Sequence, residues 1–137
     1  MTTIASFLLA ASAVIILVLG LMHLLYTLRG RNLHPRDPEL EARLRVVSPV
    51  ITRQTSMWKA WIGFNASHSF GAILFGSMYG YLAVLHSAFL FQSVFLQLLG
   101  LLFLAGYVVL GKLCWFSIPF HGAMLASALY IVALAVR

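Results

Sequence analysis

Long apolar stretches alternate with short polar ones along this chain, and the polar ones mark where it turns. The first apolar stretch covers roughly residues 4–28 and ends before Arg29. A helix needs about 20 consecutive apolar residues to cross a bilayer, so this stretch predicts a membrane span. The chain is apolar again, with hardly a charge, from Met57 to Gly111. That distance is too long for one crossing, so the second stretch must contain a turn.

The turn is expected around residues 83–87, where His86 and Ser87 interrupt the apolar run. Another turn is expected at Gly111 and Lys112. With these turns, the predicted spans cover residues 4–28, 57–82, 88–110 and 113–136, each bound being approximate. The pattern therefore predicts an all-α fold: an integral membrane four-helix bundle that forms a single membrane domain over residues 1–137.

The composition agrees with a membrane protein. Hydrophobic residues make up 62% of the 137 residues and charged residues 9%, and the mean hydropathy is +0.98. A soluble domain of this length needs far more polar surface to cover its core. We therefore expect the lipid bilayer to be the main partner of this chain.

Most of the basic residues lie in the predicted connections. Six of the nine fall within residues 29–56, which we call the basic connection: Arg29, Arg31, Arg36, Arg43, Arg45 and Arg53. Arginine and lysine in such connections mark the cytoplasmic side of a membrane, so both ends of the chain are predicted to lie outside (N-out, C-out). This placement argues against a nucleic-acid partner, and it predicts that the basic connection attracts anionic lipid headgroups.

A short amphipathic helix is expected inside the basic connection, over the sequence DPELEARLRVVSP. Asp37 is a good helix cap and Pro38 suits the first helical position. An apolar stripe follows at helical spacing, formed by Leu40, Leu44 and Val47. Such a stripe beside arginines is typical of a helix that lies on the membrane surface.

Polar side chains recur inside three of the predicted spans. The second span contains GFNASHSF, in which Asn65 and His68 share one side of a helix with Trp61. The first span places His23 near Tyr26, and the fourth places Ser117 near His121. Counted at about 1.5 Å per residue, the three histidines fall in the same, cytoplasmic half of the membrane. An ionisable residue inside a span is a functional-site hypothesis by default.

These residues predict a histidine-lined pocket that binds a lipophilic ligand or cofactor and could be catalytic. The candidate acids and bases are His23, His68 and His121. The candidate ligand-binding residues are Tyr26, Trp61, Asn65, Ser67 and Ser117. A proline inside the fourth span, Pro119, would free a backbone carbonyl and bend the helix, which favours a cavity. The alternative is that the imidazoles only join helices through hydrogen bonds.

The sequence does not identify a cofactor. His23, His68 and His121 could hold zinc, copper or iron with one position open, and two of them could serve as axial ligands of a haem. No carboxylate lies within a predicted span, which argues against a carboxylate-bridged dimetal site.

A different class of function is suggested by small residues in the second span. Gly63, Ser67 and Gly71 follow one another at intervals of four, as do Ala72, Gly76 and Gly80. Such faces let membrane helices approach closely. They motivate the alternative of a non-enzymatic structural or accessory subunit of a homo-oligomer or a larger membrane complex.

The segment MWKAWIGFNASHSFG, residues 57–71, resembles a segment of small bacterial four-span membrane proteins, a family from which no activity carries over. That resemblance implies the cytoplasmic (inner) membrane of a bacterium. The overall plan is also similar to the MAPEG family of glutathione-dependent membrane enzymes, which form trimers with the glutathione site between subunits. That family has a glutamate in its second span, where this chain has Asn65 and His68 and no acid. A MAPEG-like enzyme is therefore a second alternative, and no residue role is transferred from it.

Overall fold

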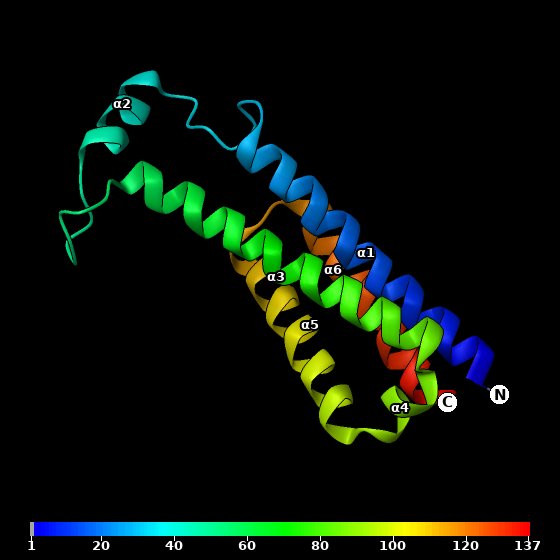
Figure 1. Ribbon diagram of the computed structural model, residues 1–137. Helices are drawn as coiled ribbons and strands as arrows, with labels where there is room; N and C mark the ends of the chain where they lie inside the picture. Colours follow the sequence, from blue (N-terminus) through cyan, green and yellow to red (C-terminus); the bar gives the residue numbers. More distant parts are fainter. Residues whose placement is uncertain (1) are drawn as a thin grey trace. The chain divides into compact units, whose positions relative to one another are not determined.

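The computed structural model describes residues 2–137, and all regular secondary structure among them is helical (Figure 1). The helices are α1 (Thr2–Leu28), α2 (Pro38–Val46), α3 (Met57–Leu85), α4 (Ser87–Gln92), α5 (Val94–Cys114) and α6 (Ser117–Ala135). Four of them, α1, α3, α5 and α6, are long and apolar enough to cross a membrane. The prediction of an all-α chain with four candidate spans is confirmed, and the orientation of those spans stays a prediction.

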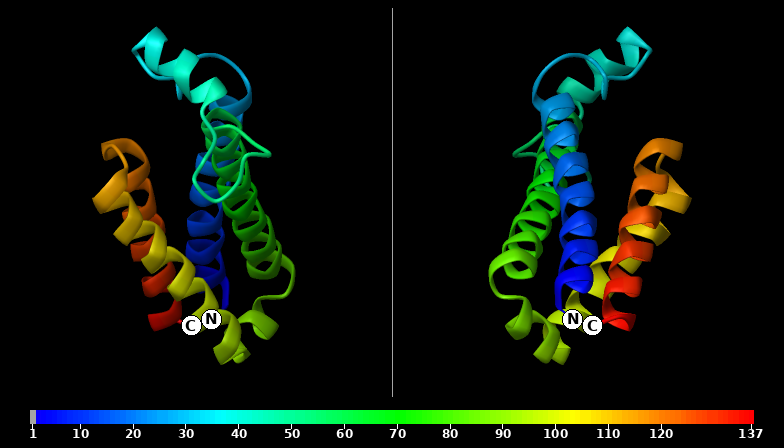
Figure 2. Two further views of the ribbon diagram at one scale, coloured as in Figure 1. Left: turned by 90° about the vertical axis from the view of Figure 1, so that its left-hand side faces the viewer. Right: turned by 90° about the vertical axis from the view of Figure 1, so that its right-hand side faces the viewer.

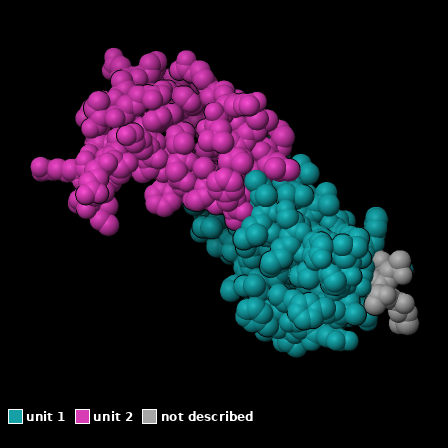
Figure 3. All heavy atoms as spheres, viewed as in Figure 1, with its two compact units in different colours: residues 1–19, 72–137 teal, residues 20–71 magenta. Residues whose placement is uncertain are grey.

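The chain divides into two compact units (Figure 3). Unit 1 comprises Met1–Leu19 and Ala72–Arg137, and unit 2 comprises Gly20–Gly71. Both α1 and α3 therefore contribute one end to each unit. Residue 1 lies outside the described residues, and the prediction of a single membrane domain stays a prediction.

Unit 1 contains the hydrophobic core. Its members come from every helix that enters this unit: Leu9, Ala13, Ile16, Ala72, Phe75, Tyr79, Ala83, Leu90, Leu104, Ala126, Tyr130 and Ala133. Helices α5 and α6 pack side by side along their length, and α1 begins near the end of unit 1 at which α6 finishes (Figure 2). The buried Ser12 hydroxyl of α1 donates a 2.7 Å hydrogen bond to the Ala126 carbonyl of α6, so a polar contact also joins these two helices.

Small residues of α3 allow α1 to approach closely in unit 1. A Cβ atom added at Gly76 would lie 2.6 Å from the Cβ atom of Leu17 and 2.7 Å from the carbonyl oxygen of Ala13. At Gly80 the same atom would lie 3.7 Å from the Cβ atom of Ala13, an ordinary contact. This part of the small-residue face is thus occupied by another helix of the same chain. It does not by itself require a second copy.

The third span begins later than the sequence predicts. The expected start was residue 88, but residues 87–92 form the separate helix α4, and α5 begins only at Val94. Ser93 lies between the two helices, and its hydroxyl accepts a 3.3 Å hydrogen bond from the backbone N–H of Leu96. The prediction of one continuous span over 88–110 is therefore wrong, because a serine cap divides it.

Side chains from neighbouring helices satisfy the carbonyl groups that this break leaves free. The Gln97 amide donates to the carbonyls of Leu90 and Phe91 at 3.4 and 2.8 Å. Arg137 donates to the Phe91 carbonyl at 2.9 Å. In addition, Tyr130 of α6 donates at 3.2 Å to the Gln97 carbonyl, which lies within α5, so this bond ties α6 to the start of α5. Non-helical backbone at membrane depth is tolerated where protein groups supply such partners, so these bonds explain why the chain can turn here.

The last turn also lies elsewhere than expected. Gly111 and Lys112 belong to α5, and the chain leaves the helix at Trp115 and Phe116. Pro119 falls in the first turn of α6, where backbone N–H groups have no partner within the helix. The turn therefore lies four residues after the predicted one at Gly111 and Lys112. The prediction that Pro119 frees a backbone carbonyl inside the span is wrong, because the first turn of a helix has no such bond to lose.

The short helix expected in the basic connection is confirmed as α2. The Asp37 side chain accepts hydrogen bonds from the backbone N–H groups of Glu39 and Leu40 at 2.9 and 3.4 Å. Pro38 occupies the first turn, where it costs no hydrogen bond. That this helix lies on a membrane surface stays a prediction.

Candidate functional site: a histidine cluster and an apolar cavity

Three of the predicted polar residues come together in unit 2. The Nε2 atom of His23, on α1, lies 3.0 Å from the Oδ1 atom of Asn65, on α3. The Asn65 amide nitrogen donates a 2.8 Å hydrogen bond to the Trp61 carbonyl one turn earlier. Because the amide NH₂ is directed at that carbonyl, Oδ1 faces the imidazole as an acceptor, and a neutral His23 carries its proton on Nε2.

His68 completes this group, which we call the histidine cluster (His23, Asn65 and His68). Its ring meets that of His23 edge to face, with 5.3 Å between the ring centroids and 81° between the ring planes. All three side chains are half-buried. Each imidazole can both donate and accept a hydrogen bond in its neutral form and can take up a proton. The cluster therefore places two groups of this kind side by side on two candidate spans.

The hydroxyl groups next to the cluster have partners within their own helices. Thr27 donates to the His23 carbonyl at 2.7 Å, and the buried Ser69 donates to the Asn65 carbonyl at 2.9 Å. Both bonds join residues one helical turn apart, a common way for hydroxyls to be satisfied in a helix. The groups of the cluster that could bind a ligand are therefore the Asn65 amide and the two imidazoles.

The other predicted site residues are exposed. In unit 2, Tyr26 and Ser67 are exposed, and the Ser67 hydroxyl donates to the Phe64 carbonyl at 3.0 Å. In unit 1, Ser117 and His121 are exposed at the start of α6. Their predicted grouping with His23 and His68 joins the two units, and it stays a prediction.

A metal centre receives no support from the described residues. Within residues 2–137, no group of three or more His, Cys, Asp or Glu side chains is placed so that it could hold a metal ion. The three-histidine metal hypothesis for His23, His68 and His121 therefore gains nothing from the geometry.

A cavity that sequence reasoning missed lies beside the cluster in unit 2. It is open on one side, has a volume of about 290 Å³ and is lined by Leu33, His34, Pro35, Leu44, Trp58 and Trp61. The segment before α2 is held over the start of α3, since the Trp61 indole N–H donates a 3.1 Å hydrogen bond to the Leu33 carbonyl. The His34 ring also lies edge-on to Trp58, at 4.7 Å between ring centroids. We call this space the α2 cavity.

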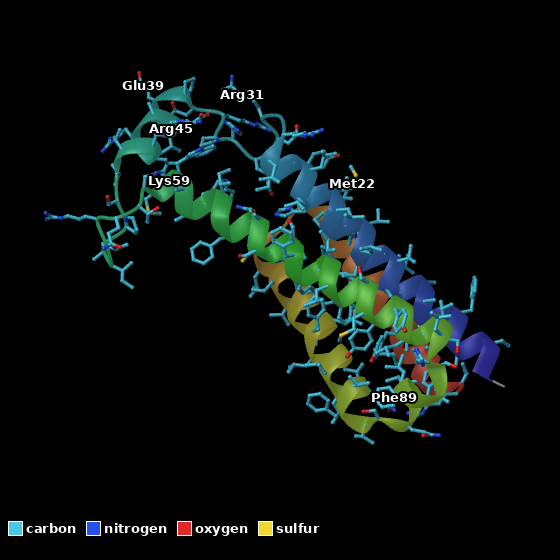
Figure 4. The ribbon with its side chains drawn as sticks, in the orientation of Figure 1. Met22, Arg31, Glu39, Arg45, Lys59 and Phe89 are labelled. Atoms are coloured by element: carbon cyan, nitrogen blue, oxygen red, sulfur yellow. The ribbon has the colours of Figure 1, made fainter. Side chains whose placement is uncertain are left out.

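A group of charged side chains fixes α2 above this cavity. Glu41 accepts hydrogen bonds from Arg45 at 2.7 and 3.2 Å and pairs with His34 at 3.0 Å. The Arg45 guanidinium also lies 4.6 Å from the centroid of the Trp58 ring, a cation–π contact. Figure 4 shows Arg45 on α2 and Lys59 at the start of α3. These contacts lower the pKa of Glu41 below its ordinary value of 4.5, Arg45 contributing most and His34 next.

Trp61 joins the two features. Its backbone carbonyl is the acceptor for Asn65, and its ring, 46% exposed, lines the α2 cavity. The sequence names Trp61 as a ligand-binding candidate. It gives no sign of the cavity, because the walls come from segments 28 residues apart, such as Leu33 and Trp61.

Comparison with known proteins adds no relative. No protein-family model matches this chain, and neither a curated protein nor a solved structure matches it. The two resemblances noted from the sequence stay predictions.

Proposed function

We propose that this chain is a small polytopic membrane protein that holds the polar end of a lipophilic ligand at the histidine cluster. The observation that carries the proposal is the hydrogen-bonded pair of His23 and Asn65 across α1 and α3, with His68 in ring contact beside it. A polar residue inside a span is costly unless it has a partner or a task. The cluster places a second imidazole, that of His68, next to the hydrogen bond that joins the two helices.

The cluster has the chemistry that a ligand with a carbonyl or hydroxyl group requires. A neutral imidazole has one donor and one acceptor. That of His23 donates to Asn65 through Nε2 and has Nδ1 as its acceptor, and the partial burial of both rings strengthens a hydrogen bond made there. The same rings are suited to take up or release a proton if the bound ligand reacts. We accordingly regard binding as the primary role and acid–base chemistry as an extension of it.

We place the basic connection on the cytoplasmic side of a bacterial inner membrane, with both ends of the chain outside. The support is the concentration of six arginines between α1 and α3, the distribution that orients membrane proteins. Protease protection in sealed vesicles tests it. Trypsin should cut within residues 29–56 only in vesicles that expose their cytoplasmic face.

The competing function is a structural subunit in which the same residues only bind helices together. Native mass spectrometry of protein purified in a mild detergent separates the two possibilities. We expect the wild type to retain a small lipophilic molecule at a fixed stoichiometry, and His68→Ala to lose it while remaining folded. His86→Ala is the matched control, since it removes the same kind of side chain from an exposed position outside the histidine cluster and should keep the molecule.

Loss of stability without loss of the bound molecule would contradict the proposal. If His68→Ala and Asn65→Ala lowered the thermal stability of the protein and left its bound molecules as in the wild type, the histidine cluster would be a helix contact only. The mass of the assembly, read from the same spectra, would then show whether the chain forms an oligomer.

A further inference from the structure

We propose that the α2 cavity is a second binding site, for an anionic amphiphile. The apolar part of such a molecule would occupy the cavity, and its phosphate or carboxylate group would lie at the cationic rim. This inference does not depend on the histidine cluster, whose residues are left unchanged in the experiment below. A membrane lipid with an anionic headgroup is the occupant to which the proposal commits.

The walls of the cavity suit a hydrocarbon segment. Two indole rings, Trp58 and Trp61, form one side, and Leu33, Pro35 and Leu44 contribute apolar carbon. Its volume of about 290 Å³ lies just below the range for small-molecule sites, about 300–1,000 Å³. The space therefore suits one chain segment or ring and excludes a whole lipid, whose remainder would stay in the bilayer.

The rim carries an excess of positive charge. Arg31 and Arg45 share a single carboxylate, that of Glu41, so the group retains a net positive charge even with His34 neutral. The Arg31 side chain is 78% exposed and approaches Glu41 only to 3.8 Å, which is too long for a hydrogen bond. Its guanidinium N–H donors thus remain available to an anion. The basic connection as a whole, with six arginines against three acids, attracts the same class of molecule.

The inferred site can be tested by fluorescence quenching with lipids that carry bromine on their acyl chains. The full-length protein in mixed micelles would carry Trp115→Phe, which leaves Trp58 and Trp61, both in the cavity wall, as the fluorophores. Brominated phosphatidylglycerol is compared with brominated phosphatidylcholine of the same chains. We expect the anionic lipid to reach half-maximal quenching at a mole fraction about fivefold lower than phosphatidylcholine does. This is the ratio that about 1 kcal/mol per cation produces.

Two arginine variants distinguish a specific site at the α2 cavity from general attraction of anionic lipids to the basic connection. Arg31→Gln should abolish most of the preference for the anionic lipid. Arg53→Gln removes the same charge from an exposed position of the same connection, outside the charged group that Arg31, His34 and Arg45 form around Glu41, and it should keep the preference. Equal losses in the two variants would overturn the proposal, because charge alone would then account for binding. Equal quenching by the two lipids in the unaltered background would overturn it as well.

A further arm tests the apolar part of the site. Leu44→Phe should fill the cavity and reduce quenching by the anionic lipid to the level of the zwitterionic one; unchanged quenching would contradict the inference.

Two other occupants can be recognised in the same assay. Inorganic phosphate should compete only weakly with the lipid. If phosphate prevented the quenching completely, the site would bind a free anion in place of a lipid. If quenching decreased for both lipids as the protein concentration rose, a second copy of the chain would be the occupant, and the proposal would fail.

Discussion

Substituting Gly76 by alanine should separate α1 from α3 in unit 1. The added Cβ atom would lie 2.6 Å from the Cβ atom of Leu17 and 2.7 Å from both the Leu17 backbone nitrogen and the Ala13 carbonyl oxygen. Two of these three atoms belong to the backbone of α1, so no side-chain rotation can relieve the contact. The helix itself must move, and the core residues that pack beside it must adjust.

The size of the effect follows from two opposing contributions. Overpacking of a close-packed interior costs about 1–3 kcal/mol, while replacing glycine by alanine in a helix gains up to about 1 kcal/mol. For Gly76→Ala we therefore expect a net loss of about 1–2 kcal/mol in the free energy of unfolding. Gly63→Ala, in the same helix, meets nothing within 4 Å and should be neutral or stabilising. Gly80→Ala, with its nearest atom at 3.7 Å, should resemble Gly63→Ala.

The three variants can be compared by reversible unfolding in mixed micelles, with the loss of helical circular dichroism as the readout. Because all three replace a glycine of α3 by alanine, differences in helix propensity largely cancel. The reasoning predicts that Gly76→Ala alone is destabilised. If Gly76→Ala had the same free energy of unfolding as Gly63→Ala, the close approach of α1 and α3 at this point would be refuted.

Three further outcomes are expected. Gly100→Ala should destabilise unit 1, since the new Cβ atom would collide with the Tyr130 hydroxyl. Adding Tyr130→Phe should recover part of the loss, so the changes in unfolding free energy of the two single variants should not sum to that of the double variant. In a double-mutant cycle on His23→Ala and Asn65→Ala, the same unfolding assay should give a coupling energy of about 0.6–2 kcal/mol, as for other hydrogen bonds between membrane helices; a coupling of zero would contradict the bond. The lowered pKa of Glu41 means that its contacts stabilise the basic connection fully above the ordinary value of 4.5 and lose that effect as the pH falls through the lower folded value. Hydrogen exchange of α2 amides should show that loss on acidification in the wild type and not in Glu41→Gln.

Local signals in the sequence predicted the elements that depend on local chemistry. The end of α1 at Leu28 and the start of α3 at Met57 coincide with changes from apolar to polar sequence. The helix α2 follows from Asp37 and Pro38, whose capping roles depend only on the next few residues. The spacing of Asn65 and His68 likewise predicted that both share a face of α3, and the structure places His23 beside them.

The features that escaped prediction depend on contacts between distant segments. The break at Ser93 depends on Gln97 and on Arg137, more than 40 positions further along, whose side chains both donate to the Phe91 carbonyl. The α2 cavity exists because the Trp61 indole reaches the Leu33 carbonyl. Neither contact has a periodic signature, so an analysis of spacing along one helix has no means of finding it.

The helix break between α4 and α5 has a consequence for the order in which the protein matures during synthesis. One of the donors that complete it, Arg137, follows α6, which leaves the ribosome after α4 and α5. Until α6 has been inserted, the Phe91 carbonyl is held by the Gln97 amide alone, at 2.8 Å. A nascent chain truncated before α6 should therefore hold this turn less firmly and be cut there more readily by quality-control proteases, and the insertion of α6 secures it.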